Sequence, residues 1–169
     1  MIVLETERLQ LRHLSIDDAP FILELVNEPA WLRFIGDKGV RSLDDARGYI
    51  LGGPVDSYAR HGFGLYHTAR KADGLPVGIC GLLKRPALED VDIGFAFFER
   101  FWGNGFATEA AAAVKHHARH DIGLTRLAAI TDPTNAASIR VLQRLGLTFR
   151  ERIRLEGDSP ELDLMTCLL

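Results

Sequence analysis

Apolar and polar residues alternate over residues 7–14, which is the pattern of a strand with one buried face. Ser15 and Ser42 each precede apolar residues at helical spacing, and an aspartate follows each serine three positions later. Because this arrangement satisfies backbone N–H groups at a helix start, we predict a helix after each serine. Residues 27–41 contain a proline, glycines and Trp31, whose indole the pattern leaves exposed, so we predict a loop or a short irregular helix there.

The remainder of the chain alternates between strand and helix patterns. Strands are predicted in residues 63–85, as a pair joined by a turn at Asp73 and Gly74, and in residues 90–98, 126–131 and on both sides of 157–160. Helices are predicted over 104–121 and 135–146. This order predicts one domain over residues 1–169 of the mixed α/β class, with a central sheet of six or seven strands flanked by about four helices.

Composition narrows the functional classes. The 169 residues are 47% hydrophobic and 25% charged, as in an ordinary globular domain, and no stretch is apolar enough for a membrane span or a signal peptide. We therefore expect a cytoplasmic protein without a membrane partner. The net charge of −3 gives no electrostatic reason to expect nucleic acid. Cys80 and Cys167 lie in strand-like segments and are interpreted as buried thiols.

Two glycines immediately before the predicted helix at 104–121 suggest a binding site. Small residues occupy one face of this helix, which lets its backbone approach the sheet closely: Ala107, Ala110, Ala111, Val114 and Ala118. A right-handed crossover to the strand at 126–131 would place the helix N-terminus beyond a strand end. Unpaired N–H groups and the helix dipole favour an anion there, and Gly103 and Gly105 allow it to reach the backbone. The sequence therefore predicts a phosphate site.

Other phosphate and metal motifs fit less well. The chain has no Gly-Lys-Ser/Thr sequence of a P-loop, and Thr108 stands where the dinucleotide fingerprint G-x-G-x-x-G has its third glycine. A glycine turn that merely begins a helix remains the alternative. His116, His117 and His120 share a helix but have no HExxH glutamate, so we interpret them as a solvated face and expect no metal.

Four segments together resemble the GNAT superfamily of acetyl-CoA-dependent N-acetyltransferases, and within it the Rim-type branch that acetylates the N-termini of ribosomal proteins. They are TERLQLR (6–12), DIGF (92–95), WGNGFATEA (102–110) and NAASIRVLQRLGL (135–147). The resemblance covers nearly the whole chain. It implies the GNAT fold, a mostly antiparallel sheet splayed into a V at its parallel strand pair, near residues 97–98 and 131.

The resemblance also implies how acetyl-CoA, the expected cosubstrate, is bound. Phe97 and Phe98 would run beside the pantetheine arm, and Asn135 would bond to it. Trp102 stands where the family pattern has glutamine or arginine, which matters little because backbone N–H groups of this loop hold the pyrophosphate. The expected loop residues are Trp102, Gly103, Asn104, Gly105, Phe106, Ala107 and Thr108.

The chemistry requires a neutral amine, support for the oxyanion and a proton for the departing thiolate. We expect a backbone N–H near the end of strand 90–98 to support the oxyanion. Many family members use a tyrosine as the proton donor, but Leu142 stands at that position, so Ser138 is the candidate acid and a thiol-side contact. A serine bonded to its own helix is the alternative. Asp92 is the candidate base, with a solvated carboxylate as the alternative reading.

The acceptor is the least specified part of the prediction. Trp31, Glu156 and Asp158 belong to loops that border the acceptor site in related proteins, and an acidic cluster there would suit a cationic acceptor, although a plain polar hairpin is the alternative. An α-amine with a pKa of about 7.7–8 needs less help to lose its proton than a lysine, which favours a protein or peptide N-terminus. The alternatives are a small-molecule amine and a non-catalytic acyl-CoA-binding module. The resemblance and the apolar C-terminal segment also suggest a homodimer.

Overall fold

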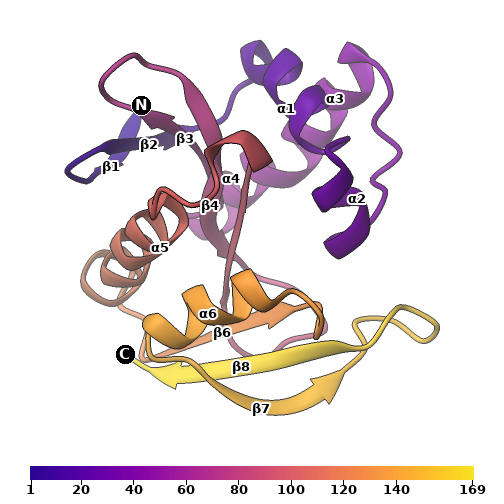
Figure 1. Cartoon of the computed structure of the whole chain (residues 1–169), viewed down its shortest axis with the longest axis vertical. Coiled ribbons are helices and arrows are strands. Elements are labelled where there is room, and N and C mark those ends of the chain that lie inside the picture. Colours follow the sequence, from indigo (N-terminus) through magenta and orange to yellow (C-terminus); the bar gives the residue numbers. More distant parts are fainter.

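The computed structural model describes residues 1–169, and all eight of its strands join a single sheet (Figure 1). The predicted count of six or seven was too low, because β1 at the N-terminus also pairs. The strands are β1 (Ile2–Glu5), β2 (Leu9–His13), β3 (Leu65–Arg70), β4 (Pro76–Leu83), β5 (Asp92–Phe97), β6 (Arg126–Thr131), β7 (Thr148–Ile153) and β8 (Leu162–Leu168).

The sheet is antiparallel except at its centre, in the order β1-β2-β3-β4-β5-β6-β8-β7. Its parallel pair, β5 and β6, is joined at one position, where Asp92 lies opposite Ala128, and beyond it the strands diverge. The strands on the two sides therefore form separate arms, with β6, β7 and β8 under α6 in Figure 1. The predicted GNAT fold and its splay are confirmed.

Six α-helices flank the sheet, more than the four that were predicted. They are α1 (Ala19–Leu25), α2 (Pro29–Phe34), α3 (Leu43–Ile50), α4 (Asp56–His61), α5 (Phe106–His117) and α6 (Ala136–Arg144). None is both long and apolar enough to cross a bilayer. The predicted serine caps are present: Oγ of Ser15 accepts a bond from the N–H of Asp17, and Oγ of Ser42 from the N–H of Asp45.

The core divides over the two faces of the sheet. Helix α5 packs through Ala110, Ala111 and Val114, which are fully buried, against residues such as Cys80 of β4. Ile79, the residue before Cys80 on β4, points to the opposite face and packs with the helices α1–α3. The stripe of small residues therefore positions the N-terminus of α5 close to the end of β5.

Two sequence expectations need correction. Trp31 was predicted to be exposed, but it lies in α2 with 5% of its surface exposed, because this segment forms a helix that packs into the core. The apolar C-terminal segment suggested a homodimer because such a segment could supply an edge strand. Instead β8 pairs with β6 on one side and β7 on the other, so the free edge of this arm is β7.

Candidate active site

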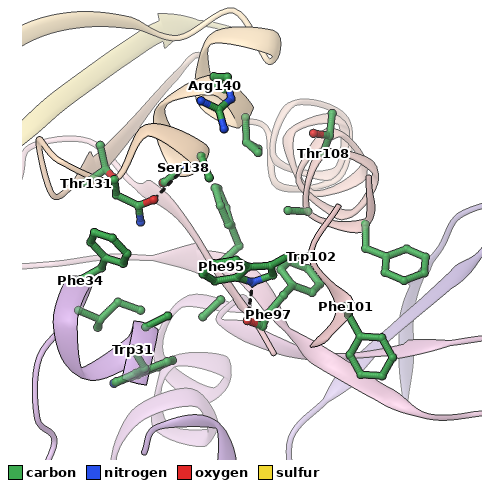
Figure 2. Close-up of a pocket in the computed structure, with 18 of the residues that line it drawn as sticks. Trp31, Phe34, Phe95, Phe97, Phe101, Trp102, Thr108, Thr131, Ser138 and Arg140 are labelled. Atoms are coloured by element: carbon green, nitrogen blue, oxygen red, sulfur yellow. Dashed lines mark hydrogen bonds between the residues drawn. The ribbon is translucent and has the colours of Figure 1, made fainter. Parts of the chain in front are cut away.

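A cleft of about 440 Å³ opens where β5 and β6 diverge. The ends of these two strands, the starts of α5 and α6, and α2 line it, and we call it the main cleft. In Figure 2, Phe95 and Phe97 of β5 lie on one side and Thr131 and Ser138 on another, with Trp31 and Phe34 contributed by α2. The splay of the sheet thus creates the cavity.

The loop before α5 has the conformation that its glycines were predicted to provide. Gly103 and Gly105 have φ of 80° and 77°, in the left-handed region that favours glycine. Gly105 is the N-terminal cap residue of α5, and no side chain caps the helix. The first N–H groups of a helix have no partner within it, so those at the start of α5 are available to a ligand in the main cleft.

Glu109 fixes the start of α5 against the first strand hairpin. Its carboxylate accepts bonds from Oγ1 of Thr6 at 2.5 Å, from the backbone N of Arg8 at 3.0 Å and from Nε of Arg8 at 2.8 Å. The sequence analysis did not identify this contact, which joins two of the four recognised motifs. We infer that it holds the anion-binding end of α5 in position.

Glu109→Gln is expected to lower the free energy of unfolding by about 1–3 kcal/mol at pH 7, because it weakens a charge-assisted network. Partial burial alone raises the pKa of Glu109, but the bonds from Thr6 and Arg8 outweigh it and lower that pKa overall. The stabilisation is therefore lost as the pH falls from about 4.3 through the lowered pKa. Urea unfolding at pH 7 and pH 3 tests this, with exposed Glu7→Gln as the control. An equal difference from wild type at both pH values would contradict it.

Trp102 and Asn104 stabilise the loop through their side chains. The Trp102 indole donates to the carbonyl of Phe97 at 2.9 Å, which ties the loop to the end of β5 (Figure 2). The Asn104 amide donates to the carbonyls of Phe101 and Trp102 and is not in the cleft lining. Phe98 was expected beside the cleft, but its ring is 1% exposed in the core between sheet and helices, because the strand alternation turns it to the other face.

The end of β5 offers unpaired backbone groups to the cleft. Phe98 N–H bonds to β4, so the alternating pattern of an antiparallel pair directs the N–H groups of Phe95 and Phe97 away from β4, toward β6. Because β6 has already diverged from β5, these groups have no strand partner. They are candidate donors to a thioester oxygen or to the amides of pantetheine.

Ser138 lies half-buried in the first turn of α6 and lines the main cleft. The Asn135 side chain caps the helix by accepting a bond from the N–H of Ser138 at 3.2 Å. The Ser138 hydroxyl itself has no protein hydrogen-bond partner. It is therefore not bonded to its own helix, which was the alternative interpretation. Leu142, one turn further on, is 1% exposed in the main core.

A second pocket of about 240 Å³ lies across the splay. It shares Phe95, Thr131 and Ser138 with the main cleft, so the two cavities meet there. Asp92 lines this second pocket and is 1% exposed, and Nε of Arg85 contacts both of its carboxylate oxygens at 3.1 and 3.2 Å. Burial raises the pKa of Asp92 to about 6, although Arg85 opposes this. Asp92 is therefore not the solvent-exposed carboxylate that was the alternative interpretation.

The acidic residues of the last hairpin do not line either cavity. Glu156 and Asp158 are exposed in the turn between β7 and β8, where Ser159 closes the turn on Glu156. Leu155 and Leu162, at the base of that turn, line the second pocket instead. The position of these residues therefore gives no support to the predicted acidic acceptor site at this turn. Trp31 does line both cavities, and its indole N–H has no hydrogen-bond partner.

Arg140 and Arg144 give the main cleft a positive charge that the sequence analysis missed. They lie one turn apart on α6, are exposed, line the cleft and form neither an ion pair nor a side-chain hydrogen bond. Figure 2 shows Arg140 and Thr108 in the same cleft, on α6 and at the start of α5. Two unpaired guanidinium groups and a free helix N-terminus together suit a polyphosphate.

Comparison with known proteins decides the family. Residues 8–148 match the model of the acetyltransferase (GNAT) domain. The chain belongs to this GNAT family. It is accordingly an acetyl-CoA-dependent N-acetyltransferase, as the motifs predicted.

Individual relatives extend this finding. YkkB of Bacillus subtilis is 29% identical over 89% of this chain and 88% of its own length. The crystal structure of an acetyltransferase from Agrobacterium tumefaciens is 26% identical, with a TM-score of 0.79 over 97% of this chain and 92% of that one. RimL, the ribosomal L7/L12 α-N-protein acetyltransferase, in complex with coenzyme A, has a TM-score of 0.84 over 100% of this chain and 98% of its own at 20% identity, so it shares the fold.

Proposed function

We propose that this GNAT protein transfers the acetyl group of acetyl-CoA to the α-amine at the N-terminus of a protein or peptide, by direct attack on the thioester. The meeting of the main cleft and the second pocket at Phe95, Thr131 and Ser138 carries the proposal. Acetyl-CoA can enter from one side of the splayed sheet and the amine from the other. The bond that reacts would then lie where the cavities join.

The main cleft suits acetyl-CoA along its whole length. The free N–H groups at the start of α5, with Arg140 and Arg144, would bind its phosphates. The amides of pantetheine would pair with the open edge of β5 at Phe95 and Phe97, as an added strand does. The Trp102 indole already occupies the Phe97 carbonyl, so that group is not available to the ligand.

The residues at the junction account for the proton transfers. The amine nitrogen attacks the carbonyl carbon, a C–N bond forms, the C–S bond breaks, and coenzyme A leaves as a thiolate. The Ser138 hydroxyl, free of protein partners, gives this thiolate a hydrogen bond, or a proton that the serine then regains from solvent. Asp92, ionised above about pH 6, takes the proton that the amine loses, through a water molecule. An N–H of Phe95 or Phe97 supports the oxyanion.

The strength of the base favours an α-amine. At pH 7 an α-amine with a pKa of about 7.7–8 is roughly 10% neutral, whereas a lysine with a pKa of about 10.4 costs roughly 3–4 kcal/mol more to deprotonate. A carboxylate whose pKa is about 6 is a modest base and suits the easier task. The fold shared with RimL, an α-N-protein acetyltransferase, agrees with this choice.

Asp92→Asn is expected to change the pH dependence of catalysis more than the stability. Since the raised pKa means that ionisation of Asp92 destabilises the folded state, the variant should be at least as stable as wild type at pH 7. The ratio of wild-type to variant kcat/KM should fall about tenfold per pH unit below about pH 6 and stay constant above it. Steady-state rates from pH 5 to pH 8 measure it. A constant ratio throughout would remove Asp92 as the base.

An acceptor comparison tests the proposed function itself. Thiol release from acetyl-CoA would be followed with a library of short peptides and with a matched set of small amines that includes polyamines, amino sugars and amino acids. Peptide turnover that vanishes when the α-amine is blocked supports the proposal. Turnover confined to small amines would replace it, and tight coenzyme A binding without any turnover would indicate a non-catalytic module.

A further inference from the structure

The polar end of the second pocket contains three side chains that have hydrogen-bond donors without a protein partner. Lys38 lies in the loop after α2, Tyr49 at the end of α3 and Arg85 in the segment after β4, and all three line this pocket. Neither the Lys38 ammonium nor the Tyr49 hydroxyl has a hydrogen-bond or ion-pair partner, and Arg85 uses only Nε, for Asp92. The two Nη groups of Arg85 are left free.

These groups lie close enough to influence one another. Lys38 is an exposed residue, but neighbouring protein atoms displace part of the water around its ammonium, and this desolvation and the positive charge of Arg85 lower its pKa. Burial raises the pKa of Tyr49, which keeps it a neutral donor, and Arg85 moderates that rise. Two cations facing one pocket repel, and Asp92 neutralises only one of them. An anion that binds between Lys38 and Arg85 would offset this repulsion.

The loop that carries Lys38 is fixed by its own contacts. Asp37 accepts bonds from the N–H of Gly39 at 2.8 Å and from Nη2 of Arg41 at 2.5 Å, and Asp45 accepts from the backbone N of Arg41 at 2.9 Å. The backbone on both sides of Lys38 is thus held between α2 and α3. The backbone position of Lys38 is therefore set before any ligand binds.

We propose that the second pocket recognises an acceptor with a carboxylate a few bonds from its α-amine, and that Lys38, Tyr49 and Arg85 bind this carboxylate. The inference rests on the proposed function and names its substrate class. Arg85 links the carboxylate site to the candidate base, because its Nε contacts Asp92 while its Nη groups have no protein partner and the residue lines the second pocket. An amine delivered to Asp92 and an anion held by Arg85 therefore belong to one residue of the acceptor or to adjacent residues.

The dimensions and lining agree with a small acceptor end. At about 240 Å³ the second pocket is smaller than the roughly 300–1,000 Å³ of sites for drug-sized ligands. Leu65, Leu83, Leu155 and Leu162 supply an apolar wall for the carbon chain. Two sources supply this chemistry: a free amino acid through its α-carboxylate, or a peptide through an acidic side chain at its first residue.

The test compares matched carboxylate and amide acceptors. Tetrapeptides that differ only in glutamate or glutamine at the first position, and free glutamine against glutamine amide, would be assayed with wild type, Lys38→Met and Tyr49→Phe. Wild type should prefer the carboxylate partner about tenfold or more in kcat/KM, and Lys38→Met should abolish that preference. Exposed Lys71→Met, on the far turn between β3 and β4, is the control. Which of the two series is acetylated shows whether the natural acceptor is a free amino acid or a peptide.

A binding measurement keeps this inference separate from the proposed function. In the presence of coenzyme A, the N-acetylated glutamate peptide should raise the melting temperature of wild type more than its glutamine counterpart, and Lys38→Met should remove the difference. If both peptides are acetylated equally well and bind equally, the carboxylate site is wrong and the proposed function stands. If no amine is acetylated, the proposed function fails, and carboxylate-dependent binding decides whether the site remains.

Discussion

Gly105→Asp is expected to weaken acetyl-CoA binding by about 10²-fold or more. Gly105 caps α5 with φ of 77°, a conformation that side chains rarely adopt, and lines the main cleft at the place assigned to the pyrophosphate. A carboxylate about 4 Å from a phosphate costs up to about 4 kcal/mol at an effective dielectric constant of about 20, and it would also occupy the free N–H groups. The dissociation constant of coenzyme A, measured by titration calorimetry, tests this.

Two controls separate charge from backbone strain. Gly105→Asn has the same shape without the charge, so it should weaken binding less than Gly105→Asp does, and the difference between them should shrink at high salt. Gly123→Asp places the same side chain at a glycine with φ of 83°, at the other end of the α5 segment, and should lower stability without changing affinity. Unchanged coenzyme A affinity in a folded Gly105→Asp protein would remove this loop from the phosphate site.

Local sequence signals predicted the cofactor side of the site. Gly103 and Gly105 imply left-handed backbone, and the alanines of α5 imply close packing on the sheet, so the position of the helix N-terminus follows from residues that are neighbours in the chain. The splay was predicted from the family resemblance. The structure shows it at the one parallel pair of the sheet, because β5 and β6 are paired at a single position. The eighth strand was missed because β1 is only four residues long.

Contacts between distant segments were not predictable in this way. Glu109 reaches Thr6 and Arg8, more than 100 positions earlier, and nothing in the local pattern of either segment indicates the other. Trp31 looked exposed because proline and glycines surround it, yet its helix packs into the core. Arg140 and Arg144 were not predicted as site residues because their positions in the sequence are those of ordinary exposed helix residues. Glu156 and Asp158 lie outside both cavities because a hairpin turn can point its tip away from a pocket that its base lines.

Ser138 acts, in the proposed mechanism, only after the C–S bond begins to break. Its hydroxyl is free of protein partners, it lies where the main cleft and the second pocket meet, and the residue at the tyrosine position, Leu142, is buried and has no proton to give. An interaction made mainly in the transition state affects kcat and leaves ground-state binding unchanged. Substitution of Ser138 should therefore lower kcat without the loss of affinity that is expected when a residue that binds acetyl-CoA is replaced.

Ser138→Ala is expected to lower kcat by about 10²–10³-fold and to leave the dissociation constant of acetyl-CoA nearly unchanged. Ser138→Cys, which keeps a proton donor of similar size, should retain more of the rate than the alanine variant does. Asn135→Ala removes the cap of α6 and should lower stability by about 0.5–2 kcal/mol, so it measures the effect of helix damage on stability only, since Asn135 also lines the main cleft. The decisive measurement is kcat with a saturating acceptor. A Ser138→Ala rate within about twofold of wild type, worth under half a kcal/mol, would end the role of Ser138 as the acid, and a loss of affinity alone would assign it to binding.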